Sequence, residues 1–166
     1  MDERLDDQGV YVPLKQFLAT TACPPEWRRY DLYLFRDDAV VFYVGQSYNA
    51  FERVWEHLRG GPKGRSIVGR FVLCNWPRSM RFTVGLLSSQ SPRFEAVGYD
   101  PGAAERYLIE QLAPCFNETL NTSPTPLPGE YLPPTAKIKH LKSLKRLLRE
   151  AGYAARFERN SKSMAL

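Results

Sequence analysis

The chain has 166 residues, of which 43% are hydrophobic and 13% aromatic, enough for one domain with a hydrophobic core. With 25% charged residues and no apolar run long enough to cross a bilayer, the sequence excludes a membrane protein. Three scattered cysteines and only two histidines exclude a disulfide framework and a cysteine-rich or histidine-rich zinc site. The acidic first residues lack the basic start of a signal peptide, so we expect an intracellular protein, in the cytoplasm or at a bacterial nucleoid.

The net charge of +5 is unevenly distributed along the chain. Seven basic residues and no acid lie between positions 57 and 94, and six basic residues and no acid lie between 137 and 149. Lys and Arg displace counterions from phosphate backbones, so the blocks favour DNA as a partner, although solubility alone could explain them. The residues we expect to contact nucleic acid are Arg59, Lys63, Arg65, Arg70, Lys139, Lys142, Lys145, Arg146 and Arg149.

The first elements are predicted from local patterns. Residues 1–12 are acidic and polar without periodicity, which indicates a tail, and we group residues 1–29 as tail and lead-in segment. Strand chemistry at 30–35 and again at 40–44, around a polar turn, predicts a β-hairpin. Asn49 as N-cap and apolar residues at positions 50, 54 and 58 then predict a helix.

The middle of the chain contains one ambiguous segment and two clear ones. Residues 66–76 are apolar and fit either a helix or a strand, whereas 81–87 favours a third strand. Asp100 as N-cap, with Pro101 at the first helical position, predicts a helix that ends before Pro114.

Glu105 is an acidic residue on the apolar face of that helix. It lies three, four and seven positions before apolar residues, so its carboxylate projects from the side that faces the core. A carboxylate there is costly unless it is paired, protonated or bound to a metal. Glu105 is therefore a candidate functional residue.

The end of the chain has a different composition. Five prolines between positions 122 and 135 predict an extended linker, placed at 123–135. Beyond it, a leucine stripe predicts a helix over 136–151, with a tail to residue 166. This segment is too short for a zinc finger or a full helix-turn-helix, and its stripe needs a partner, either the domain itself or another protein.

Several residues capable of phosphodiester chemistry follow one another at regular spacing. Tyr33 and Tyr43 are ten residues apart, and Arg53 follows ten residues later. Glu105 precedes Asn117, in the sequence Pro-Cys-Phe-Asn, by twelve residues. Each element alone has an ordinary structural explanation, such as strand packing, an exposed helix face or a salt bridge.

This order and spacing, together with Tyr-Val-Gly at 43–45 and His57 one helical turn after the arginine, resemble the GIY-YIG nuclease superfamily. The resemblance covers residues 30–122. The sequence departs from the family pattern at Asp31, which replaces a glycine, at Val44, which replaces an isoleucine, and at Gln46, which is a lysine in some members.

The resemblance implies an α/β fold with a small central three-stranded antiparallel sheet flanked by helices, here followed by a basic C-terminal helical extension. It also implies a metal-dependent endonuclease that hydrolyses DNA. Family members act in repair, recombination, restriction and intron mobility, and a separate module usually selects the target. In this chain we expect either poor sequence specificity or a homodimer or partner protein that supplies that selection.

The resemblance also implies roles for the site residues. Glu105 would hold Mg²⁺ or Mn²⁺, and no other cofactor is expected. Arg53 would stabilise the charge on the phosphate, and His57 would orient a tyrosine hydroxyl or relay a proton. Either tyrosine could accept the proton of the attacking water.

We favour Tyr33 as this general base, with Tyr43 positioning the water or the phosphate, and with Asn117 bracing the glutamate side of the site. The alternative is a catalytically weak or inactive DNA-binding or scaffold protein on the same fold. Asp31 and Gln46, the main departures from the family pattern, are the features that favour it.

Overall fold

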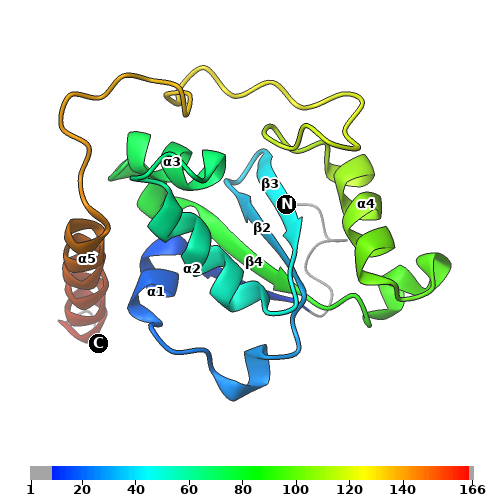
Figure 1. The fold of residues 1–166 in the computed structure, drawn as a ribbon. Coiled ribbons are helices and arrows are strands. Elements are labelled where there is room, and N and C mark those ends of the chain that lie inside the picture. The colour runs from blue at the N-terminus through cyan, green and yellow to red at the C-terminus, as the bar shows by residue number, and fades with distance from the viewer. Residues whose placement is uncertain (1–8, 165–166) are drawn as a thin grey trace.

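A computed structural model describes residues 9–164 of the chain, with side chains to residue 158 (Figure 1). It confirms an α/β fold, built on one antiparallel sheet with strand order β1-β4-β2-β3. The strands are β1 (Val10–Pro13), β2 (Leu32–Arg36), β3 (Val41–Gln46) and β4 (Thr83–Leu87). The predicted hairpin and third strand correspond to β2, β3 and β4, and the described residues contain one strand more than the three expected.

The additional strand corrects the prediction for the N-terminal segment. Residues 10–12, expected in a tail, belong to β1, and they are followed by α1 (Leu14–Ala19). Leu14 and Phe17 of α1 are fully buried. Such a short apolar stretch gives little local evidence of a strand, because it is stabilised by pairing with β4. The rest of the expected tail, residues 1–8, lies outside the described residues.

Helices cover both faces of the sheet (Figure 1). The helices α1, α2 (Ala50–Gly60) and α3 (Ile67–Cys74) pack on one face, and α4 (Pro101–Leu112) packs on the other. The ambiguous segment is thus a helix. Among the described residues, three short 3₁₀ helices, η2 (Pro25–Trp27), η3 (Arg78–Arg81) and η4 (Pro92–Val97), lie in the connections.

The two predicted N-caps are confirmed. The Asn49 side chain accepts the backbone N–H of Glu52, and the Asp100 side chain accepts that of Ala103. These bonds satisfy amides that have no partner inside a helix, which is why a local pattern locates both helix starts well.

The proline-rich segment 123–135 has no helix or strand, as expected, but it is fastened to the domain. The side chain of Asn75 donates to the carbonyl of Leu132 and accepts its N–H. The Tyr131 hydroxyl donates to a carboxylate oxygen of Asp37 at 2.6 Å. The segment is therefore a strap held against the domain rather than a free tether.

The C-terminal helix also differs from the prediction. Helix α5 spans Leu144–Met164, so it begins eight residues after the predicted start at 136 and continues past 151. Leu147 and Ala151 are fully buried in the same core as α1 and α2. Packing against α1 determines where the helix lies, so α5 is part of the domain and not an appendage.

Within residues 9–164, none of the helices combines the length and the apolarity needed to cross a membrane.

Replacing Leu147 with alanine tests the place of α5 in the core. Removing a fully buried leucine should lower the free energy of unfolding by about 2–5 kcal/mol, measured by urea denaturation. The matched control is Tyr153→Ala on the exposed side of α5, which should change it by less than about 0.5 kcal/mol. Equal effects of the two substitutions would contradict the packing described here.

Candidate active site

The two tyrosines of the predicted site lie on neighbouring strands and on the same face of the sheet. Tyr33 pairs with Gly45 across the hairpin, and its ring centre lies 6.2 Å from that of Tyr43. A Cβ atom on Gly45 would lie 2.2 Å from the Tyr33 ring. The glycine of Tyr-Val-Gly is therefore required by the ring that lies across it.

A chain of hydrogen bonds links Tyr33 to two helices. The Tyr33 hydroxyl lies 2.7 Å from Nε2 of His57, on α2, and Nδ1 of His57 lies 2.7 Å from Oγ of Ser66. The Ser66 hydroxyl also accepts the backbone N–H of Gly69, which caps α3. Two residues far apart in sequence, Tyr33 and Ser66, thus hold one imidazole in a fixed orientation.

Ser66 is the site residue that the sequence interpretation missed. A serine before an apolar run, three residues ahead of an amide it can cap, is a recognisable N-cap pattern. Its bond to His57 depends instead on the close approach of α2 and α3, where a Cβ on Gly69 would lie 2.0 Å from the His57 carbonyl oxygen. No local sequence pattern predicts this close contact between α2 and α3.

Burial sets the protonation states of these groups. It lowers the pKa of His57 to about 4, with the Arg53 charge acting in the same direction, so the imidazole is neutral at pH 7. Burial also raises the pKa of Tyr33 well above its ordinary value, and the neighbouring Arg53 only partly opposes this. The pKa of Tyr43 is raised by burial and by the charge of Glu105, against a hydrogen bond with Tyr33. Both tyrosines are therefore protonated in the resting site.

Arg53 lies one turn before His57 on α2, with an exposed guanidinium. Its Nη1 donates to a carboxylate oxygen of Glu56 at 2.7 Å, and it is close enough to lower the pKa of both tyrosines. With 47% of its side chain exposed, Arg53 can reach a phosphate without leaving the helix face.

Glu105 comes to the site from the opposite side, on α4, next to the end of β3. Its half-buried carboxylate accepts the backbone N–H of Gln46, and burial raises its pKa above the ordinary value. Among the described residues, no group of three or more His, Cys, Asp or Glu could hold a metal ion. One carboxylate fits only a hard cation such as Mg²⁺, which takes its remaining oxygen ligands from water and substrate phosphate.

Both polar atoms of the Asn117 side chain form hydrogen bonds with the backbone of β3. Its Oδ1 accepts the N–H of Val44 at 2.9 Å, and its Nδ2 donates to the carbonyl of Val44 at 2.8 Å. It holds the strand between Tyr43 and Gly45 as a further strand would. The side chain of Asn117 therefore contacts the backbone of β3, and its expected role at the glutamate side of the site stays a prediction.

The side chain of Asp31 does not take part in the hydrogen-bonded chain around His57. Its carboxylate accepts the backbone N–H and the hydroxyl of Ser89, which joins the start of β2 to the loop after β4. The side chain of Gln46 is exposed at the end of β3. Of these two departures from the family pattern, the aspartate is therefore explained by a local structural bond.

A basic cleft of about 350 Å³ adjoins the hydrogen-bonded chain. Arg59, Lys63 and Arg65, from the end of α2 and the loop after it, line it. Arg53 and His57 line the same cleft, together with Glu56, which pairs with Arg53. Cations outnumber this acid, so the positive charge extends to the site.

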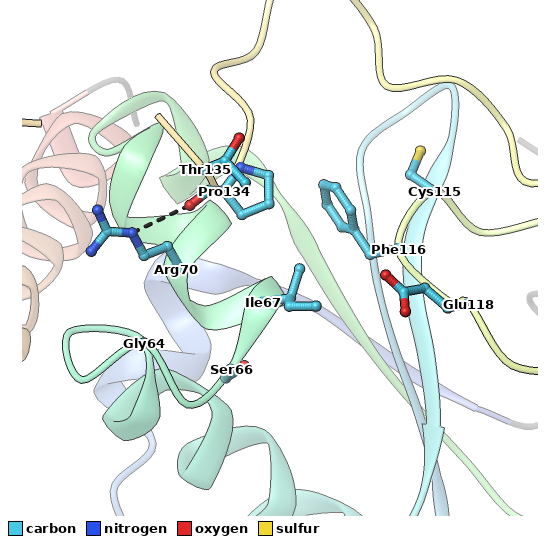
Figure 2. A pocket seen from close by; sticks show the side chains of 9 residues that line it. All are labelled: Gly64, Ser66, Ile67, Arg70, Cys115, Phe116, Glu118, Pro134 and Thr135. Atoms are coloured by element: carbon cyan, nitrogen blue, oxygen red, sulfur yellow. Dashed lines mark hydrogen bonds between the residues drawn. The ribbon is translucent and has the colours of Figure 1, made fainter. Parts of the chain in front are cut away.

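Arg70, expected among these residues, is used elsewhere. It donates to the carbonyl of Pro134 in the strap and to that of Ala136 just after it, at 3.3 and 3.4 Å. Figure 2 shows its guanidinium turned toward Pro134, beside a pocket of about 450 Å³ between α3 and the strap. Ile67 and Phe116 supply apolar walls of this second pocket, which shares Ser66 with the basic cleft.

The second basic block is divided in the same way. Lys142 and Arg146 donate to the carboxylate of Glu150, whose pKa is lowered first by a hydrogen bond from Trp76 and then by these two cations. Lys139, Lys145 and Arg149 are exposed. Only part of this block is therefore available to a polyanion.

No protein-family model, no curated protein and no solved structure matches this chain. The interpretation of the site therefore depends on its own geometry.

The buried imidazole gives the stability of the protein a defined pH dependence. In the unfolded chain His57 becomes protonated as the pH falls below about 6.5, whereas in the folded protein it stays neutral down to about pH 4. Stability should therefore fall by about 3 kcal/mol as the pH drops through this window, and this residue should contribute no slope above it.

Urea denaturation between pH 7 and pH 4 measures the effect. His57→Gln should flatten the slope, whereas the control His140→Gln, at an exposed position, should leave it unchanged. An identical slope in wild type and His57→Gln would show that the imidazole titrates normally in the fold.

Proposed function

We propose that this protein is a metal-dependent endonuclease of the GIY-YIG type that hydrolyses phosphodiester bonds in DNA. One observation carries the proposal: Tyr33 is hydrogen-bonded to the neutral His57 between an arginine on one helix and a half-buried glutamate on another. The basic cleft beside this group supports a polyanionic substrate.

Proton transfer begins at Tyr33. A protonated tyrosine can accept a proton from water only if it gives up its own, and the Nε2 lone pair of His57 lies 2.7 Å from the hydroxyl. This requires the tautomer in which Nδ1 carries the hydrogen and donates it to Ser66. We therefore assign Tyr33 as general base, His57 as the acceptor of its proton, and Ser66 as the residue that fixes the tautomer.

The remaining groups act on charge. Arg53 forks onto the phosphate oxygens, whose negative charge increases as the water attacks. Glu105 would hold the Mg²⁺ or Mn²⁺ ion, which would supply Lewis-acid stabilisation of the phosphate and of the leaving oxygen. Tyr43, half-buried between the tyrosine base and the glutamate, positions the attacking water or the phosphate.

The test is incubation of the purified full-length protein with supercoiled, linear, branched and single-stranded DNA, in Mg²⁺ and in EDTA. We expect cleavage in Mg²⁺ only. DNA binding without cleavage in every substrate would instead favour the scaffold alternative.

Replacing Glu105 with glutamine separates chemistry from binding. The substitution keeps the shape of the side chain and removes the charge that holds the cation, so cleavage should be lost. DNA affinity should stay within a few-fold, because the basic residues supply the phosphate contacts. Glu110→Gln, at an exposed position on the same helix, is the matched control and should cleave normally. Cleavage by Glu105→Gln at the wild-type rate would end this assignment.

Phenylalanine substitutions distinguish the two tyrosines. Tyr33→Phe removes the hydroxyl bonded to His57, so the cleavage rate should fall by roughly 10² to 10⁴ while the fold is retained. Tyr48→Phe, at a residue that is 99% exposed, serves as control. A mild effect of Tyr33→Phe together with a severe effect of Tyr43→Phe would reverse the roles assigned here.

A further inference from the structure

The side of α5 that faces away from the core carries aromatic and basic side chains together. Tyr153 and Phe157, one helical turn apart, are 66% and 73% exposed. Helical spacing places Arg149 and Arg156 on the same side, and the Arg156 guanidinium lies 5.1 Å from the centre of the Tyr153 ring. We call these four residues the α5 outer face.

Packing does not explain these rings. The opposite side of α5, with Leu147 and Ala151, supplies the contact with the core. Two large aromatic side chains left in solvent one turn apart are unusual on a helix that already has a buried face. Helix α5 itself lies next to α1, on the other side of the molecule from α4 (Figure 1).

The charge of the outer face is unbalanced. In residues 144–158 the acids are Glu150 and Glu158. The first is held by Trp76, Lys142 and Arg146, and the second is paired with Lys15 across the contact with α1. Glu150 lies three residues before Tyr153, on the side of the rings, but its carboxylate is already bonded to Trp76, Lys142 and Arg146. Among the described residues, no ion pair joins Arg149 or Arg156 to an acid of α5.

We propose that the α5 outer face binds an unpaired nucleic-acid strand, with Tyr153 and Phe157 stacking on bases and Arg149 and Arg156 contacting phosphates. Both faces of a base inside a duplex are already stacked, so the rings can only engage a strand that is unpaired. A second copy of the chain fits less well, because a symmetric contact would bring the arginines of two copies together.

This inference rests on the proposed function for its choice of nucleic acid and deepens it. The preferred substrate would contain a single-stranded segment beside the duplex, as a branch or flap does. The outer face would hold the unpaired segment while the basic cleft holds the strand to be cut.

Fluorescence anisotropy tests the inference with the full-length protein in EDTA, where cleavage does not interfere. The probes are a labelled oligothymidylate and a labelled duplex of the same length. The Tyr153→Ala/Phe157→Ala double variant should bind the oligothymidylate about 10- to 100-fold more weakly, with duplex affinity changed by less than about 3-fold. The control is Leu120→Ala/Leu132→Ala, which removes two half-exposed side chains elsewhere and should bind both probes as the wild type does.

A second variant tests the arginines. Arg149→Gln should flatten the slope of log affinity for the oligothymidylate against log salt by about 0.7 for one lost phosphate contact. An unchanged slope and an unchanged affinity of the double variant would overturn the inference. A double variant with unchanged strand affinity but a lower oligomeric mass by light scattering would also overturn it, and would assign the face to a protein contact.

The outcomes for cleavage remain separate. A wild-type protein that binds the oligothymidylate through α5 but cuts no DNA in Mg²⁺ would support the inference and overturn the proposed function. If the wild-type protein cuts DNA and the double variant binds the oligothymidylate normally, the proposed function is supported and the inference is overturned.

Discussion

The position of the Tyr33 ring across Gly45 is the constraint on which the site depends. Because Gly45 has no Cβ, the Tyr33 ring can lie against β3 with its hydroxyl directed to α2. His57 must then be at that point of the helix, and Ser66 must be close enough to hold its other nitrogen. That second condition requires the backbones of α2 and α3 to touch, which the absence of a side chain at Gly69 permits.

This arrangement costs stability. A neutral buried imidazole, two tyrosines with raised pKa values and a half-buried glutamate are less favourable than apolar side chains of similar size. The aromatic core behind the hairpin offsets the cost: Phe42, Phe71 and Phe82 pack within 4.7 to 5.5 Å of one another, and Tyr131 of the strap adds edge contacts. Polar groups held out of water on such a rigid support are typical of a site that carries out chemistry.

The positive charge of the chain is divided by the fold into structural and available parts. Arg70 fastens the strap, and Lys142 and Arg146 pair with Glu150. Two of the surfaces that remain basic are the cleft beside His57 and the outer face of α5. A protein that held a strand at both surfaces would fix its direction across the site as well as its position.

The sequence by itself determined the local elements: the hairpin, the two capped helices and the order of Tyr33, Tyr43, Arg53 and Glu105. Each depends on turn residues, caps or spacing, which act over a few positions. Tertiary structure alone decided the strand at residues 10–13, the burial of α5, the strap and the partner of His57. Those features arise from contacts between segments far apart in the chain: β1 exists because β4 pairs with it, Leu147 is buried because α1 packs against it, and Ser66 contacts His57 because Gly69 lets the helices approach. Local pattern carries no information about which distant surface will be present to complete it.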